Sequence, residues 1–513
     1  MYWKPNSNKT QERAVAERLR RSSQFYRFLY EIRGQLFADG FEDELIASYK
    51  PRGQNPCPPA LLAVVMLLQR YEGLSDARAV DAAENDRRWQ LVLGTLGREQ
   101  APFGQGSLVR FRLRMMAHDL DRKLVDRTVE LAKKSGAFGW KNLRVCLDSS
   151  PLEGAGRVED AWNLIGRAMS KVVHAVSMAL DIDEGQVIQG AQLSVLKSDS
   201  VKAAIDIDWD DDRAKKDALE RLLNQVSRLE KWVANRASKA SQQPPLKDAL
   251  RLMRRAVEQD TEPDPSGKGH RIKQGVSKDR IISVGDIEMR HGRKSKTKRF
   301  NGYKRHIAIA HNLVLGTAVH AANVNEWHAT RTLLEAVARH GKIKKLDIDR
   351  GYLPSSEVES LSRNAVEINC RPWKATKHKG YYGKGKFKID LSRRQIICPE
   401  GNIAKVFPSG AAWFEQEDCQ RCCQKSFCTP SERRTVIVHE HEQLHIRLRK
   451  ASGTKQGRKE LRKRVAVEHR LARVGAIQGP RARYKGARKN ELDLNRAAAI
   501  ANLQEIARIR RAA

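Results

Sequence analysis

The sequence predicts an α/β protein in which a mixed β-sheet follows an all-helical N-terminal part. Apolar residues recur with the 3.6-residue period of a helix through several segments between residues 11 and 135. Beyond them, short β-branched runs at 142–151, 304–311, 314–322 and 344–349 alternate with helix-prone segments. The resulting order of strand, hairpin, helix and strand allows the first and fourth strands to be neighbours in one sheet.

The length and charge of the chain indicate several domains and a polyanionic partner. With 513 residues and 58.1 kDa, two to four domains are expected, and charged, helix-prone residues from about 195 to 285 indicate a helical insertion. The chain has 96 Lys and Arg against 61 Asp and Glu, a net charge of +35 and an isoelectric point near 10.1. Nucleic acid is therefore the first expected partner; the alternative is a merely soluble basic protein, or one resting on an acidic membrane.

No segment predicts a membrane span or secretion. The longest apolar run, at 59–68, is far shorter than the roughly 18 residues that cross a bilayer. The N-terminal segment lacks the apolar core and cleavage site of a signal peptide. Eight cysteines in so long a chain do not indicate a disulfide framework. We therefore expect a cytoplasmic protein without a membrane partner.

Two aspartates stand where apolar runs meet turns. Asp148 precedes a Ser-Ser-Pro turn, and Asp349 precedes Arg-Gly-Tyr. Asp347 shares a face with Asp349, because side chains alternate along a strand. A carboxylate at a strand tip is favourable when it is paired or holds a cation, so we choose Asp349 as a ligand and Asp347 as a solvated neighbour. The alternative is that both aspartates cap the turn that follows.

A third acid would be needed for metal-assisted phosphoryl transfer, in which about three carboxylates hold two Mg²⁺ ions roughly 3.5 to 4 Å apart. Glu468 is the candidate. In one continuous helix it shares a stripe with Leu461, Val465 and Leu471, so it would face inward, where a charge needs a cation. The alternative is an ion pair with Arg464, four residues earlier in the same helix.

Five segments of the chain form motifs that occur together in one protein family. They are PPALLAVVMLLQRYEGLSDARAVDAAENDRRW in the helical part, LRVCLDSSPLEGAGRVEDAWNLIGRAM around Asp148, MRHGRKSKTKRFNGYKRHIAIA, DIDRGY around Asp349, and RKRVAVEHRLARV around Glu468. In this order they resemble the DDE transposases of bacterial insertion sequences, in the IS-four/IS-five-like superfamily and in particular its eleven-eighty-two branch. The resemblance covers nearly the whole chain.

The resemblance implies a fold and a metal site. The fold is a ribonuclease H-like mixed-sheet catalytic core with an all-α N-terminal domain, a helical insertion and an insertion before the third acid. In this core Asp148, Asp349 and Glu468 bind two Mg²⁺ or Mn²⁺ ions. The implied domains are a DNA-binding domain at 1–139, the first part of the core at 140–350, an insertion at 351–455 and a C-terminal helical part at 456–513.

The resemblance also implies an activity. Such an enzyme binds the terminal repeats of its own insertion sequence, cleaves double-stranded DNA at the element ends and joins the 3′ ends to target DNA. It acts as a homodimer or larger assembly in a bacterial cytoplasm, at the nucleoid. Arg464 matches the family signature around the third acid, whereas Leu461 and Gly475 stand where the signature has Tyr and Lys. The alternatives are a non-catalytic DNA-binding descendant and a metal-dependent nuclease without strand transfer.

Basic residues in two segments are candidate contacts to DNA phosphates. A helix at 107–116 carries arginines that form either a DNA-binding face or a merely solvated one. A basic loop runs from Arg290 to Arg305. Together with Arg464, the candidates are Arg110, Arg112, Arg114, Arg293, Lys294, Lys296, Lys298, Arg299, Lys304 and Arg305.

Five of the eight cysteines lie between residues 398 and 428. Cys419 and Cys422 have the CxxC spacing of a zinc half-site. With Cys398 and Cys428 they could complete a structural Zn²⁺ site of four thiolates, although the second pair is irregularly spaced. The alternative is a group of ordinary buried thiols.

Overall fold

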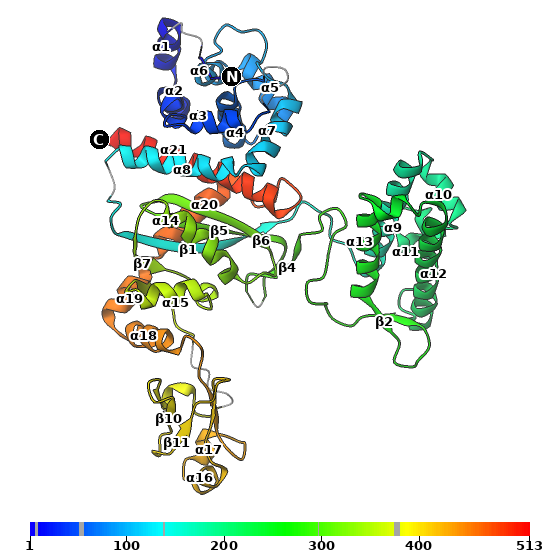
Figure 1. Ribbon diagram of the computed structural model, residues 1–513, viewed down its shortest axis with the longest axis vertical. Helices are drawn as coiled ribbons and strands as arrows, with labels where there is room; N and C mark the ends of the chain where they lie inside the picture. Colours follow the sequence, from blue (N-terminus) through cyan, green and yellow to red (C-terminus); the bar gives the residue numbers. More distant parts are fainter. Residues whose placement is uncertain (6–8, 51–55, 137–138, 296, 374–379, 513) are drawn as a thin grey trace.

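A computed structural model describes the chain except for residues 6–8, 51–55, 137–138, 296, 374–379 and 513. Figure 1 shows a central sheet with N-terminal helices at one end, a helical unit at one side and a small unit at the other end. The predicted α/β class, with a mixed sheet and many helices, is confirmed. None of the helices described is both long and apolar enough to cross a membrane.

The N-terminal helices pack around α4 (Pro59–Glu72), which is apolar on nearly every side and is buried from Pro59 to Gln69. Gly73 follows the last residue of α4 and has a left-handed backbone conformation. Glycine adopts this conformation without strain because it has no Cβ. Ser75 then caps the next helix by accepting a hydrogen bond from the Arg78 N–H. The other helices are α1 (Lys9–Arg18), α2 (Gln24–Leu36), α3 (Phe41–Ala47), α5 (Asp76–Asn85), α6 (Arg87–Leu93), α7 (Gln105–Ala117) and α8 (Leu120–Lys134).

The central sheet is mixed, and its middle strand is β1 (Leu143–Glu153). β1 is antiparallel to β5 (Arg299–Ala310) on one side and parallel to β7 (Ile343–Asp347) on the other. The prediction that the first and fourth strands are neighbours is therefore confirmed. The remaining strands are β4 (Arg290–Arg293) and β6 (Leu313–Ala321), both antiparallel to β5, and β8 (Glu367–Asn369), parallel to β7.

Helices cover both faces of this sheet. On β6, Gly316 lies against α14 (Thr330–Ala338), whereas the next residue, Thr317, hydrogen-bonds to α21 (Ala487–Ala512). Because adjacent strand residues point to opposite faces, α14 and α21 lie on opposite sides. Thr317 pairs with Ile307, which pairs with Asp148, so Asp148 points to the side of α21. α20 (Val465–Gln478) packs on this side against β1 and α21.

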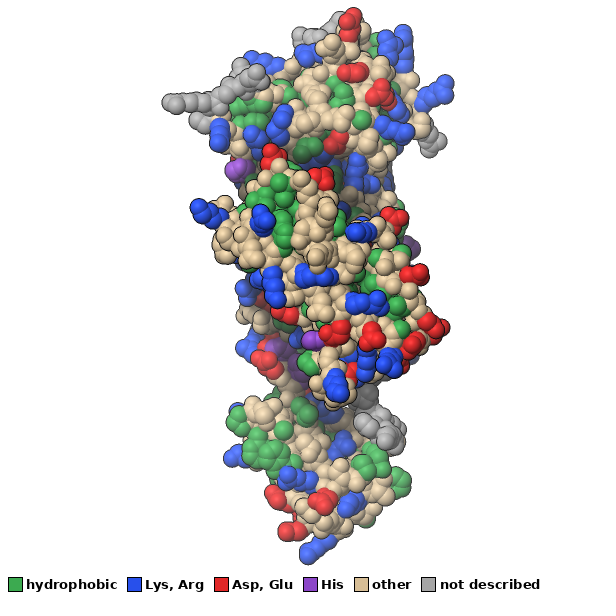
Figure 2. All heavy atoms as spheres, turned by 90° about the vertical axis from the view of Figure 1, so that its right-hand side faces the viewer, with side chains coloured by type: hydrophobic (Ala, Val, Ile, Leu, Met, Phe, Trp, Pro, Cys, Tyr) green, Lys and Arg blue, Asp and Glu red, His purple; other side chains and the backbone are tan. Residues whose placement is uncertain are grey.

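Between β1 and β4 the chain forms a helical unit with its own apolar core, which includes Trp162, Met169, Leu222 and Met253. Its helices are α9 (Ala161–Leu180), α10 (Glu184–Gly190), α11 (Val201–Ile205), α12 (Asp212–Arg236) and α13 (Leu246–Asp260), followed by the strand pair β2 (Thr261–Pro263) and β3 (His270–Ile272). Figure 2, in which this unit faces the viewer, shows lysines and arginines scattered over it rather than gathered in one patch.

A small unit between β8 and α18 packs around Phe387, Ile396 and Phe414. It contains β9 (Lys388–Asp390), β10 (Gln395–Ile397), β11 (Ile403–Lys405), β12 (Ala411–Trp413), α16 (Gln416–Arg421), α17 (Lys425–Cys428) and β13 (Thr435–Ile437). Figure 1 shows it below α18. The flanking helices are α15 (Ser356–Arg363), α18 (Glu442–Gly453) and α19 (Lys455–Arg462), and α19 leads to α20.

Candidate active site

Asp148 and Asp349 come from the two parallel strands in the middle of the sheet. Cys146 of β1 lies opposite Asp347 of β7, and the two strands are parallel. Asp148 and Asp349 each lie two residues further along the chain, so they are neighbours at the same end of the strand pair. Asp148 is buried, and the N–H of Ser149 donates to its Oδ1 at 2.8 Å. Asp349 follows the end of β7 and precedes the short helix η5 (Arg350–Tyr352), with about half of its side chain exposed.

Arg464 connects these two aspartates. Its Nη1 donates to Asp349 Oδ1, and its Nη2 donates to Asp148 Oδ1 at 3.4 Å. The hydrogen bond from Arg464 lowers the pKa of Asp349. Burial raises the pKa of Asp148 to about 6, in spite of the opposing effect of Arg464. Two carboxylates that share one cation in this way form a site suited to positive charge.

Asp347 is not the solvated neighbour of Asp349 that the sequence predicted. Its carboxylate is buried and accepts hydrogen bonds from Arg144 Nε and Nη2 at 2.7 and 2.8 Å. The Asn369 side-chain amide donates to it at 2.5 Å. The prediction was wrong because β8 covers this edge of β7, so that Asp347 is enclosed while Asp349 lies beyond the strand end. The alternative role of a turn cap also fails for Asp347.

Glu468 is exposed on α20, so the prediction that it faces inward is wrong. That prediction assumed one continuous helix, but α19 ends at Arg462 and α20 begins at Val465. The buried face of α20 contains Leu471 and Val474, and Glu468 lies at its margin. Arg464 precedes α20 and contacts the aspartates instead of forming the alternative intrahelical pair.

Glu326 is a carboxylate at this site that sequence reasoning missed. It begins the short helix η4 (Glu326–Ala329), which follows β6 and contacts η5. Its Oε1 accepts a hydrogen bond from Ser149 Oγ at 2.6 Å, and its Oε2 packs against Gly351. Its charge also contributes to the raised pKa of Asp148. An acid five residues after the end of a strand was the available signal.

The donor set at this site fits Mg²⁺ or Mn²⁺, which prefer carboxylate oxygens. Asp148 and Asp349 supply such oxygens, and they already share the positive charge of Arg464. Within the described residues, however, no three His, Cys, Asp or Glu side chains are grouped closely enough to hold a metal ion. The side chains described here therefore do not by themselves form a complete divalent-cation site.

Besides Arg464, three of the predicted phosphate contacts have protein partners instead. Arg112 is buried and donates to Asp76 at 2.5 and 2.8 Å, because it lies two residues from Arg110 and Arg114 and so points to another side of α7. Arg305 is also buried; it lies on the face of β5 covered by α20, and it donates to Ser150, Gln478 and the Gly479 carbonyl at 2.8 to 3.0 Å. Lys304 donates to the Val324 carbonyl at 2.9 Å. Lys296 lies outside the described residues.

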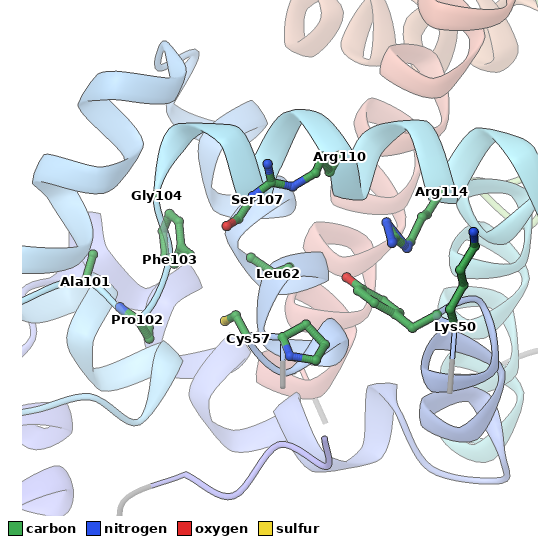
Figure 3. Close-up of a pocket in the computed structure, with 12 residues that line it drawn as sticks. Lys50, Cys57, Leu62, Ala101, Pro102, Phe103, Gly104, Ser107, Arg110 and Arg114 are labelled. Atoms are coloured by element: carbon green, nitrogen blue, oxygen red, sulfur yellow. The ribbon is translucent and has the colours of Figure 1, made fainter. Parts of the chain in front are cut away.

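The other basic candidates are accessible and fall in two places. Arg293, Lys294, Lys298 and Arg299 are exposed at the tip of the β4–β5 hairpin. Arg110 is exposed on α7 beside Arg114, which lies 4.1 Å from the ring centre of Tyr49. Figure 3 shows both arginines along α7 above an open pocket of about 840 Å³, with Lys50 at its edge.

The four cysteines proposed as zinc ligands are neighbours in the small unit. Cys398, Cys419 and Cys428 pack at the edge of its apolar core. Burial raises the pKa of Cys428, and Cys419, Cys422 and Cys398 raise it further. Backbone N–H groups of Gln424 and Arg434 donate to the sulfurs of Cys422 and Cys419 at 3.4 and 3.5 Å. All four thiols are free, and they do not form a closed metal site.

Comparisons with known proteins match two parts of the chain. Residues 396–507 match a family model described as "Transposase DDE domain". Residues 15–114 match a model described as "Transposase domain (DUF772)". The first match includes α19, α20 and Arg464, and the second includes α2 to α6 and most of α7. Neither a curated protein nor a solved structure matches the chain.

Proposed function

We propose a reaction for this chain on the premise that it is a DDE transposase of the insertion-sequence type, as the two family-model matches indicate. The chain binds the terminal repeats of its own element, cleaves DNA at the element ends and joins the 3′ ends to target DNA. Its motifs favour the eleven-eighty-two branch of the IS-four/IS-five-like superfamily. It acts in the bacterial cytoplasm on nucleoid DNA.

The observation that carries the proposal is the meeting of Asp148 and Asp349 at neighbouring parallel strands, with one guanidinium bound to both. The strand order supports a ribonuclease H-like core: the antiparallel strands β6, β5 and β1 lie side by side, and the parallel strands β7 and β8 follow on the other side of β1. The aspartates stand beside each other only because β7 returns next to β1.

Both steps of the reaction are displacements at phosphorus, first by water and then by the 3′ hydroxyl, and they need positioning and charge neutralisation more than a protein nucleophile. When bound, two Mg²⁺ or Mn²⁺ ions would activate the attacking oxygen and stabilise the leaving oxygen. Asp148 and Asp349 would hold them, with Glu468 as the third acid. Support for Glu468 is its place one helical turn beyond Arg464, which already reaches both aspartates.

Arg464 has two roles in this proposal. In the DNA-free chain its guanidinium forms ion pairs with both aspartates. When divalent cations take over that role, the guanidinium is released and can bind a phosphate of the DNA next to the cleaved bond. Leu461 and Gly475 stand where the family signature has Tyr and Lys, so Arg464 is the one basic or aromatic residue of that signature retained here.

The DNA surface that we propose consists of the hairpin tip and the basic edge of α7. The tip carries Arg293, Lys294, Lys298 and Arg299. Arg299 lies eight residues along β5 from Ile307, which is opposite Asp148, so the tip is roughly 25 Å from the aspartates. That spacing lets one double helix contact both. A homodimer or larger assembly would bring two element ends together.

A structural zinc ion in the small unit is a separate proposal. Its support is the proximity of four thiols, whose charges affect one another, and the backbone N–H groups directed at two of the sulfurs. Four thiolates would close the site to water and substrate, so its role would be to stabilise the unit. Small rearrangements of Cys398, Cys419, Cys422 and Cys428 would be needed to gather the sulfurs.

The test is a cleavage and strand-transfer assay with the purified chain, Mg²⁺ and DNA carrying the ends of its element. Nicks at the 3′ ends together with joined products support the proposal. Nicks without joined products identify a nuclease, and binding without nicks identifies a non-catalytic DNA-binding protein. Asp148→Asn is the control, because it should bind the same DNA without cutting it.

A further inference from the structure

Helix α7 presents two large apolar side chains to solvent. Val109 and Leu113 are 46% and 52% exposed, although the other side of α7 is buried in the core of the N-terminal helices. Because residues three and four apart share a helix face, the exposed Gly106 and Ala117 lie on the same stripe. We call these four residues the α7 face. Two aliphatic side chains between two small residues make a surface that a partner can approach closely.

The charge beside the α7 face fits a polyanion. α7 contains three arginines and neither Asp nor Glu. Among the described residues, only the buried Arg112 of these three has an ion pair, with Asp76. Arg110 is exposed next to the α7 face, and Figure 3 shows it together with Arg114 along the helix. Unpaired arginines beside aliphatic side chains are complementary to DNA, which offers phosphates and, in its major groove, the methyl groups of thymine.

A second copy of this chain is less well suited to the α7 face. Each copy carries a net charge of +35, and a symmetric contact would bring the arginines of α7 close to those of the partner helix. Like charges placed opposite each other at an interface are unfavourable. DNA has the opposite charge, so it is the occupant that we infer.

α7 is held in a fixed orientation, as a helix that contacts base edges must be. Arg112 donates to both carboxylate oxygens of Asp76 at 2.5 and 2.8 Å, and the Gln69 side chain of α4 donates to the same carboxylate at 2.6 Å. Near the end of the helix, Arg488 of α21 donates to the Met116 carbonyl at 3.1 Å. These contacts fix the direction of the α7 face before any DNA is bound.

The guanidinium of Arg110 lies beside the α7 face without covering its centre. It extends back over Gly106, where a Cβ would be 3.6 Å from Arg110 Nη1. Val109 and Leu113 therefore remain open, with the positive charge at one margin. This is the arrangement expected of a helix whose middle contacts bases and whose edge contacts a phosphate.

We propose that α7 lies in the major groove at the element ends, where Val109 and Leu113 recognise thymine by contact with its 5-methyl group and Arg110 binds a phosphate. The inference rests on the DNA binding of the proposed function and adds the residues that select the sequence. The major groove is about 12 Å wide and admits an α-helix, and thymine is the base that presents a methyl group there.

The experiment measures binding of the full-length chain, without divalent cations, to duplexes that the wild type selects from a random-sequence library. Each duplex is made with thymine and with deoxyuridine, which lacks only the 5-methyl group. The wild type should bind the thymine duplex at least about threefold more tightly, because each buried methyl group favours binding by about that factor. Equal binding of the two duplexes by the wild type overturns the proposal.

The double variant Val109→Ala and Leu113→Ala should lose the preference for thymine, and its salt dependence should stay like that of the wild type because no charge is removed. Arg110→Gln should do the reverse: it keeps the preference and reduces the log–log salt slope by about 0.9. Met178→Ala with Ile446→Ala, which removes exposed apolar side chains from α9 and α18, is the matched control and should retain the preference. Circular dichroism checks the fold of each variant.

Two outcomes for the α7 double variant would contradict the proposal. One is an unchanged preference for thymine. The other is the loss of an oligomer in light scattering without DNA, which would show that the α7 face joins two copies of the chain.

DNA cleavage separates this inference from the proposed function. If the wild type cuts and joins element ends in Mg²⁺ but binds thymine and deoxyuridine duplexes equally, the transposase function stands and recognition by α7 is refuted. If the preference depends on Val109 and Leu113 but no DNA is cut, recognition by α7 stands and the proposed catalysis fails.

Discussion

Arg144 of β1 and Asp347 of β7 form a two-bond ion pair, with distances of 2.7 and 2.8 Å from the guanidinium to the carboxylate. The same guanidinium donates to Glu460 of α19 at 2.9 Å. The pair therefore joins two neighbouring strands to the helix that precedes Arg464. Through this chain of contacts, a buried structural aspartate helps to place the arginine that reaches the candidate active site.

Asp347→Asn should destabilise the chain much more than Asp349→Asn does. Asp347 is buried, so loss of its charge weakens both bonds from Arg144 and costs about 2 to 4 kcal/mol of unfolding free energy. Asp349 is half exposed, and its replacement should cost at most about 1 kcal/mol. Urea unfolding of the full chain measures both. Equal stability of the two variants would contradict the assignment of separate structural and catalytic roles.

Asp347 and Asp349 show which features of the site could be predicted from the sequence alone. Strand alternation places Asp347 and Asp349 on one face, and the chain order predicts that their strand lies beside that of Asp148; the strand pairing is confirmed. Which aspartate is enclosed depends on β8, a strand of three residues whose Asn369 contacts Asp347. So short a strand leaves too weak a pattern to recognise in advance.

Three other differences between prediction and structure have separate causes. Arginines two residues apart cannot share one helix face, so the burial of Arg112 was predictable from helical geometry alone. The break between α19 and α20 was not predictable, because the segment from Arg462 to Val465 contains neither Gly nor Pro. The place of Glu326 depends on the meeting of η4 with η5, a tertiary contact that no local pattern encodes.

Removal of the hairpin charges should flatten the salt dependence of DNA binding. Each phosphate contact that is lost reduces the log–log slope by about 0.9. The variant replaces four exposed residues by alanine, Arg293, Lys294, Lys298 and Arg299. Filter binding or anisotropy from low to high salt gives the slope.

The control for this variant removes the same net charge from the helical unit, at the exposed residues Lys231, Arg236, Lys239 and Lys247. It should retain a steeper slope than the hairpin variant. Identical slopes in the two variants would mean that only the total charge of the protein matters, and that the hairpin tip is not part of the DNA surface.

Arg464→Gln should strengthen Mn²⁺ binding by the DNA-free chain while reducing DNA cleavage. The guanidinium that is paired with Asp148 and Asp349 competes with an incoming cation, and glutamine removes that competition. We expect affinity to rise about three- to tenfold, equivalent to about 0.7 to 1.4 kcal/mol. Arg473→Gln, exposed on α20, is the control. Unchanged or weaker Mn²⁺ binding in Arg464→Gln would show that Arg464 does not occupy the place of the cation.

Zinc, if bound, should be lost on replacement of Cys422 but not of its neighbour Cys423. Cys423 is exposed and lies 3.7 Å from Glu400, outside the proposed set of four thiolates. Purified without chelators, the wild type and Cys423→Ser should carry about one zinc per chain, and Cys422→Ser should carry none. Because metal affinity becomes folding energy for a small unit, Cys422→Ser should also be cut by protease within residues 380–438, while the sheet core stays intact. Elemental analysis and limited proteolysis make these measurements. A zinc-free wild type, or a Cys422→Ser variant as resistant as Cys423→Ser, would return these cysteines to the role of ordinary buried thiols.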